Sequence, residues 1–190
     1  MPAPHHPRNR GPAAAADNRA AILDAARRLF ARDGYRVPLS AIARAAGVGQ
    51  GVLYRHFPSR LDLAYEVFED NFAVLDQTAA QSAGPDCFAL LWRQLVEYTI
   101  DSTAFVEMVL DAGDEPPARV GAERLLGLFA RPLARAQAAG LADPSWTTRD
   151  VLLLQHMVYG VIAASPVGAD VRAGVRRAVE LIDPRLAEAL

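Results

Sequence analysis

The stretch Gly47-Val48-Gly49-Gln50-Gly51 joins two short segments whose apolar residues have helical spacing. In residues 39–46 the apolar positions repeat at i, i+3, i+4 and i+7, which is typical of one face of an α-helix. After the glycines, Leu53 and Phe57 lie four residues apart, which again places them on one helical face. Glycines in such a place have two interpretations. They form either a loop that cradles a phosphate or a tight turn between two helices.

The residues around the glycines exclude the phosphate loop. Dinucleotide-binding and P-loop motifs follow a β-strand and open a full-length helix, and the P-loop ends in Gly-Lys-Ser/Thr. Here the stretch follows a helical segment, lacks that ending and leads into only two helical turns, because Pro58 stops the helix. We therefore predict a helix-turn-helix, with helices at 39–46 and 50–56 and with Val48 in the core between them. The second helix of such a unit can enter the major groove of DNA.

Helical hydrophobic spacing continues through the rest of the chain. Residues 18–34 form an amphipathic pattern, and Ser59 followed by Asp62 matches the capping box that opens a long helix. Further helices are expected at 86–101, 103–112, 117–139, 147–164 and 169–190. No segment alternates polar and apolar residues as a strand does. The sequence therefore predicts an all-α fold of about nine helices.

Charge is divided unevenly along the chain, although the net charge is only −2. Residues 1–60 carry ten arginines against three aspartates, a net charge of +7, whereas residues 61–190 carry ten arginines against nineteen acidic residues, a net charge of −9. The difference indicates that the N-terminal third meets a polyanion; the alternative is a chance fluctuation in an arginine-rich proteome. We expect a flexible arm at 1–16, a helix-turn-helix domain at 17–60 and a helical domain at 61–190.

The composition argues against membrane, secreted and catalytic classes. The longest strongly apolar window, residues 151–164, spans 14 residues, whereas a membrane span needs about 20. We find no secretory signal and only one cysteine, Cys87, so a cytoplasmic location is expected. The His5-His6 pair has no third metal ligand near it. We expect no catalytic residues, no metal, no cofactor and no membrane partner, and hence no enzyme.

Two segments resemble the N-terminal domain of tetracycline-repressor-like (TetR-family) transcriptional regulators: IxxAARRLFARDGY and LSAIARAAGVGQGVLYRHFPSRLDL, within about residues 18–65. The resemblance is specific at Ile42-Ala43, Ala46-Gly47-Val48, Leu53-Tyr54, Phe57-Pro58-Ser59 and Arg60. Beyond them the chain resembles the family only in length and helix count. The resemblance implies a DNA-binding domain followed by a ligand-binding and dimerisation domain. It also implies a homodimeric regulator, expected to be a repressor associated with the bacterial nucleoid, that binds a palindromic operator and is released by a small-molecule effector.

By position in the family motif, the recognition helix begins at Gln50, which can pair with adenine, and Gly51 allows a close backbone approach. The DNA-binding residues that the resemblance implies are Arg44, Gln50, Gly51, Val52, Tyr54, Arg55, His56 and Arg60. For Arg44 and Arg55 a solvated surface is the alternative. The chain lacks hydroxyls that the family usually carries, because Pro38, Gly49 and Val52 stand at those positions, and the usual lysine is Arg60.

The same resemblance implies an effector pocket and a dimer interface in the C-terminal region. Candidate pocket residues are Phe72, Trp92, Leu95, Tyr98, Phe105, Met108, Phe129 and His156, with ordinary core packing as the alternative. Helices 147–164 and 169–190 are expected to form a two-fold four-helix bundle through Leu153, Met157, Val161, Val171, Val175, Val179 and Ile182. The alternative is that residues 151–162 form the central core helix of a monomer.

Acidic residues pair at i, i+4 in Glu97 with Asp101 and in Glu107 with Asp111. They indicate either a cationic partner or a solvated surface. Two other functions remain open. The missing hydroxyls leave room for a helical small-molecule-binding module with a vestigial helix-turn-helix, and a DNA-packaging protein without sequence preference would bind scrambled DNA equally well.

Overall fold

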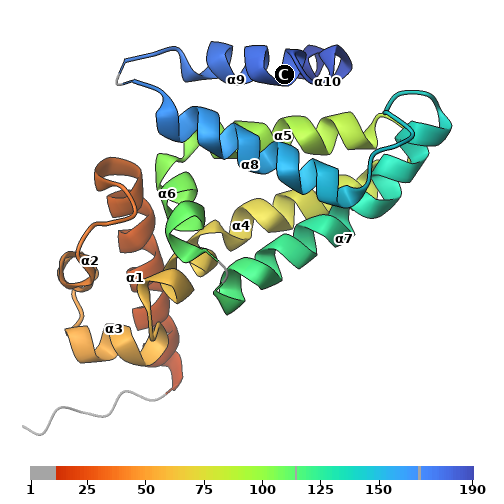
Figure 1. Ribbon diagram of the computed structural model, residues 1–190. Helices are drawn as coiled ribbons and strands as arrows, with labels where there is room; N and C mark the ends of the chain where they lie inside the picture. The colour runs from red at the N-terminus through yellow and green to blue at the C-terminus, as the bar shows by residue number, and fades with distance from the viewer. Residues whose placement is uncertain (1–11, 114, 167) are drawn as a thin grey trace, which may run out of the picture.

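The computed structural model describes residues 12–113, 115–166 and 168–190, and every regular element within these ranges is an α-helix (Figure 1). The helices are α1 (Pro12–Asp33), α2 (Leu39–Ala45), α3 (Gln50–His56), α4 (Arg60–Gln81), α5 (Cys87–Asp101), α6 (Thr103–Ala112), α7 (Pro116–Ala138), α8 (Thr148–Ala164), α9 (Val171–Glu180) and α10 (Pro184–Glu188). The predicted all-α fold is confirmed, and in this part of the chain there are ten helices rather than about nine.

Helices α1, α2 and α3 form a small unit at one end of the molecule, and α4 leads from this unit into the larger bundle (Figure 1). The core of the unit is built from Ile22 and Phe30 of α1, Ile42 of α2 and Leu53 of α3, all buried. This core does not stop at the boundary expected at residue 60. The first half of α4 and buried residues of α6, among them Met108, belong to the same cluster.

A second hydrophobic core lies within the C-terminal bundle. Helix α5 contributes Phe88 and Trp92, α7 contributes Phe129, and α8 contributes Val158. The Phe88 and Phe129 rings meet edge to face with their centroids 5.9 Å apart. Helix α9 packs against α8, and α10 packs against α9 (Figure 1). In the described ranges, no helix combines the length and apolarity needed to cross a bilayer.

Two expected boundaries are wrong. Helix α1 already begins at Pro12, so residues 12–16 are helical rather than part of a flexible arm; residues 1–11, including the His5-His6 pair, lie outside the described residues. The helix expected at 169–190 is broken after Glu180 because Pro184 cannot donate a backbone hydrogen bond. Asp183 caps the new helix, and its Oδ1 accepts a hydrogen bond from the Arg185 N–H at 2.9 Å.

The capping box predicted at the start of α4 is confirmed. The Asp62 N–H donates to Ser59 Oγ at 3.1 Å, and the Ser59 N–H donates to Asp62 Oδ2 at 3.0 Å. Replacing Ser59 with alanine is expected to lower the free energy of unfolding by about 1 kcal/mol, measured by urea denaturation. Ser82→Ala, at the other end of α4, is the control and should change it by much less. Equal losses from both variants would contradict a specific capping role.

Candidate nucleic-acid interface and ligand cavity

The glycine stretch forms the turn between α2 and α3. Gly47 has a φ of +70°, a left-handed conformation that residues with a Cβ rarely adopt. The Val48 N–H then donates to the Ala43 carbonyl at 3.0 Å, which closes the end of α2. Gly49 is extended and precedes the first residue of α3. The predicted helix-turn-helix geometry is therefore present, with half-buried Val48 packed against the N-terminal core.

Helix α3 has one buried side and one solvent-facing side. Leu53 is 1% exposed, whereas Tyr54 is 50% exposed and Gln50, Gly51 and Arg55 are also classed as exposed. A Cβ placed on Gly51 would meet nothing within 4 Å, so the backbone is open there. Arg55 donates through Nε to the Gly51 carbonyl at 3.2 Å, within its own helix. These four residues give α3 an exposed surface with an amide, a phenol and a cation.

The other residues of α2 and α3 that were predicted to contact DNA differ in exposure. Arg44 is exposed in the last turn of α2. Val52 and His56 are half-buried, and the His56 ring lies 6.3 Å from the Phe57 ring. The structure therefore brings the predicted residues of α2 and α3 into one region, while their contacts with DNA stay a prediction.

Arg60 has internal partners that the sequence did not indicate. Its Nη1 donates to the Tyr35 carbonyl at 2.7 Å and also to the Val37 carbonyl. The guanidinium lies 5.5 Å from the centroid of the Tyr35 ring. Arg60 thus ties the start of α4 to the loop between α1 and α2. The predicted phosphate contact of Arg60 has to compete with these bonds.

The acidic pairs have cationic or N–H partners inside the chain. Glu107 Oε2 accepts a hydrogen bond from the Tyr35 N–H at 2.9 Å, and Asp111 lies 3.2 Å from Arg36. Both acids are on α6 and both partners are in the α1–α2 loop, so α6 is attached to the helix-turn-helix unit. The other pair, Glu97 and Asp101, faces Arg172 of α9.

A cavity of about 440 Å³ lies in the C-terminal bundle, with walls from α4 to α8. It is lined by Tyr65, Phe72, Leu95, Phe105, Val109, Leu110, Gly113, Ala118, Arg119, Gly121, Ala122, Leu125, Leu152, His156 and Tyr159. Four of the eight predicted pocket residues, Phe72, Leu95, Phe105 and His156, are among them. Trp92, Met108 and Phe129 do not line this cavity and are fully buried core residues. Tyr98 does not line it either and packs against the core.

The polar side chains of the cavity were not among the predicted pocket residues. Tyr65, Arg119 and Tyr159 all line it. Burial raises the pKa of the Tyr65 and Tyr159 phenols, so both stay neutral and can donate a hydrogen bond at pH 7. Three small residues of α7, Ala118, Gly121 and Ala122, also line the cavity, but such a pattern fits close helix packing as well.

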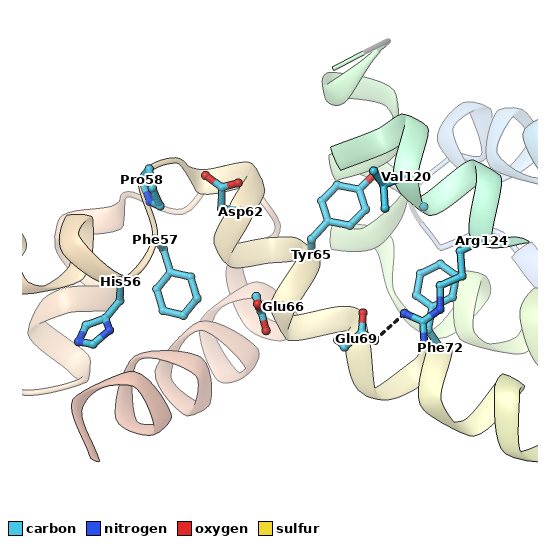
Figure 2. A pocket seen from close by; sticks show the side chains of 11 residues that line it. His56, Phe57, Pro58, Asp62, Tyr65, Glu66, Glu69, Phe72, Val120 and Arg124 are labelled. Atoms are coloured by element: carbon cyan, nitrogen blue, oxygen red, sulfur yellow. Dashed lines mark hydrogen bonds and ion pairs between the residues drawn. The ribbon is translucent and has the colours of Figure 1, made fainter. Parts of the chain in front are cut away.

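A second hollow, a groove of about 610 Å³, runs between the helix-turn-helix unit and α7 (Figure 2). Its side chains include His56, Phe57, Pro58, Asp62, Tyr65, Glu66, Glu69, Phe72, Val120 and Arg124. Glu69 pairs with Arg124 at 2.5 Å, as Figure 2 shows, and Glu66 pairs with Arg19 at 2.7 Å. Because these groove charges are already paired, the more apolar cavity is the better candidate for an organic ligand.

The residues predicted for the dimer interface fall into two groups. Val175 and Val179 are 0% and 2% exposed within the single chain, so that part of the prediction is wrong: α9 packs these valines onto its own bundle. Leu153 and Met157 are 57% and 46% exposed, and Ile182 is also exposed. Val161 and Val171 are half-buried. The solvent-facing part of the predicted interface is therefore mainly on α8.

Comparison with known proteins places these features in one family. Residues 22–67 match the model of bacterial regulatory proteins, tetR family. The chain is 39% identical over 106 residues to an HTH-type transcriptional regulator of Staphylococcus aureus (strain USA300), covering 53% of this chain and 57% of the relative. It is 32% identical to the solved TetR transcription regulatory protein from Mycobacterium vanbaalenii, with a TM-score of 0.53, covering 79% of this chain and 95% of that one. The chain belongs to the TetR family.

The extent of the likeness differs along this TetR-family chain. It spans about half the length of the curated relatives it matches. Thermus thermophilus FadR, solved in complex with lauroyl-CoA, has the same fold at 22% identity and a TM-score of 0.59, covering 90% of this chain and 94% of FadR. The family model itself matches residues 22–67, in the N-terminal region.

The departures from the TetR-family motif have a visible structural consequence. Pro38 precedes α2 and Gly49 precedes α3, and neither helix has a side-chain cap. The first amides of α3 are therefore not satisfied by a hydroxyl of the preceding residue. Within the described ranges, no three His, Cys, Asp or Glu side chains come together as a metal site requires.

Proposed function

We propose that the chain is a transcriptional repressor that binds a palindromic operator as a homodimer and is released by a small-molecule effector. The observation that carries this proposal is the exposed surface of α3, where Gln50, Gly51, Tyr54 and Arg55 face solvent beside a buried Leu53. The +7 charge of residues 1–60 supports a polyanionic partner. Membership of the TetR family supports the same role. The proposal assigns the chain no catalytic step.

In the proposed complex, α3 lies in the major groove. The Gln50 amide pairs with an adenine edge, while Tyr54 and Arg55 contact phosphates. Two copies of α3 about 34 Å apart read successive major grooves of a two-fold-related site. The second copy is supplied through the exposed surface of α8, which carries no arginine and no acidic residue between Leu153 and Ala164.

Helix α6 couples effector binding in the cavity to release of the protein from DNA. Phe105 and Val109 of this helix line the cavity, whereas Glu107 and Asp111 hold the α1–α2 loop. A ligand that requires a different position of α6 therefore also favours a different position of the helix-turn-helix unit. It shifts the equilibrium only by its difference in affinity for the two arrangements.

The central test is a fluorescence-anisotropy titration with the DNA upstream of the protein's own gene. We expect sequence-specific binding that weakens as salt rises. Gln50→Ala should weaken it by about 1–3 kcal/mol and relax the preference at one base position. Salt-insensitive binding, or none, would contradict the proposal, and equal binding of scrambled DNA would favour a packaging protein.

Replacing Arg55 or Arg60 with glutamine is expected to change different properties: operator binding for Arg55 and stability for Arg60. Arg55→Gln should weaken operator binding and reduce the slope of log affinity against log salt by about 0.9, because one phosphate contact is lost. Arg60→Gln should leave that slope unchanged and lower the free energy of unfolding by about 2 kcal/mol, because two carbonyls lose a charged donor. Salt-dependent titrations and urea denaturation of both variants measure these effects. A reduced slope with unchanged stability in the Arg60 variant would instead show a phosphate contact.

The second candidate, a ligand-binding module with a vestigial helix-turn-helix, is favoured by the uncapped starts of α2 and α3. It predicts ligand binding without operator binding. Tyr54→Phe separates the two: a regulator should lose operator affinity and keep ligand affinity, whereas the module has no operator affinity to lose.

A further inference from the structure

The cavity differs in charge from the region that surrounds it. Residues 61–190 carry nineteen acidic residues against ten arginines, yet none of the fifteen described residues that line the cavity is acidic. The titratable side chains of the lining are Arg119, His156, Tyr65 and Tyr159. Both phenols stay neutral, as their raised pKa values indicate. The charge that the lining can present is therefore positive.

The positive group comes from the first turn of α7. Arg119 is exposed, and among the described residues no carboxylate lies within ion-pair distance of it. Arg124, one turn and a half farther along α7, is different: it binds both Glu69 and Asp76 at 2.5 Å and does not line the cavity. On α8, the His156 ring lies 5.8 Å from the Tyr159 ring. Arg119 and His156 thus offer donors to a ligand rather than to the protein.

The remaining walls of the cavity are apolar and come from several helices. The apolar lining includes Leu95 of α5, Phe105 and Val109 of α6, Leu125 of α7 and Leu152 of α8. A volume of about 440 Å³ is within the range of sites for drug-sized organic molecules. A ligand that fills the cavity therefore has a mainly apolar body.

We infer that the cavity takes an apolar organic acid, whose body contacts Phe105, Leu125 and Leu152 and whose carboxylate faces Arg119 and His156. This inference rests on the proposed function, in which the cavity holds the effector. A carboxylate can leave water only where cationic or N–H donors replace its hydration, and the lining offers both. An ammonium ligand would meet like charge and, among the described lining residues, no acidic partner. A neutral ligand would leave Arg119 without effect on affinity.

The test measures ligand binding to the purified full chain without DNA, by isothermal titration calorimetry. The probes are two matched series that differ only in the polar group: decanoate, decanol and decylamine, and 2-naphthoate, 2-naphthol and 2-naphthylamine. In at least one series the acid should bind about tenfold more tightly than the amine and the alcohol. The inference is overturned if the amine or the alcohol binds as tightly as the acid in both series, or if none of the six probes binds.

Variants test whether the preference for the acid arises in the cavity. Arg119→Met should lower the affinity for the acid about tenfold and leave the alcohol unchanged. Arg131→Met, an exposed arginine farther along α7, is the matched control and should change neither. Ala122→Phe, which fills the cavity, should abolish binding of the acid, with circular dichroism confirming the fold. An Arg119 variant that keeps the full preference for the acid would overturn the inference.

Failure of this inference is distinguishable from failure of the proposed function. If the chain prefers the acid but does not bind operator DNA, the proposed regulatory function is refuted and the inferred ligand class is supported. A chain that binds its operator but prefers the amine refutes the ligand class alone.

Discussion

Replacing Met157 with glutamate is expected to leave the protein monomeric and to lower its operator affinity roughly hundredfold or more. Met157 is 46% exposed on α8, one turn from Leu153, which is 57% exposed. In a two-fold interface each residue lies near the same surface of the partner, so a new charge is introduced on both sides at once. Burying unpaired carboxylates costs several kcal/mol. A monomer engages only one half-site, and the gain from linking two half-sites is lost.

Sedimentation velocity gives the oligomeric state of the Met157 variant, and anisotropy with the operator gives its affinity. Val74→Glu is the control, because Val74 of α4 is similarly exposed at 41% and lies outside the proposed interface. The control should remain dimeric and keep its operator affinity. A Met157 variant that still dimerises would place the interface elsewhere, and a monomer with unchanged affinity would contradict cooperative use of two half-sites.

The helix-turn-helix could be predicted from the sequence because its signals are local. Gly47 ends α2 through its left-handed conformation, and the Ser59–Asp62 capping box joins residues three apart. The bonds of Arg60 could not be predicted in this way, since its partners lie 25 and 23 residues earlier. The contact from Tyr35 to Glu107 spans 72 residues. Only the folded chain brings such groups together.

In the C-terminal region, the hydrophobic pattern predicts which residues are buried, but not whether they are covered by the same chain, by a partner or by a ligand. The apolar stripe with Val175 and Val179 was predicted to contact a second subunit, but it is covered by its own chain. In the same way, the aromatic spacing of α5 and α7 identified Trp92 and Phe129 as apolar interior without separating core from cavity. A cavity depends on where side chains fail to fill space, and periodicity does not contain that information.

Replacing Leu53 with alanine is expected to lower the free energy of unfolding of the N-terminal unit by about 2–5 kcal/mol. Leu53 is 1% exposed and is the buried residue within α3, so it anchors this seven-residue helix to the core. Its truncation leaves a void against Ile42 and the other residues of that core, which relaxes only in part. Operator affinity should fall with the population of folded α3. Val52→Ala, a smaller truncation at a half-buried position of the same helix, is the control and should cost much less.

Hydrogen exchange followed by mass spectrometry locates the damage in the Leu53 variant. The buried residues form two clusters, one around α1–α3 with parts of α4 and α6, and one within the C-terminal bundle. Protection should therefore fall in α1, α2 and α3 and persist in α5, α7 and α8. Because the cavity lies mainly in the second region, the variant should still bind a cavity ligand while operator binding is lost. A uniform loss of protection would mean that the two clusters unfold as one unit. A loss in unfolding free energy below 1 kcal/mol would mean that Phe57, just after α3, holds the helix without Leu53.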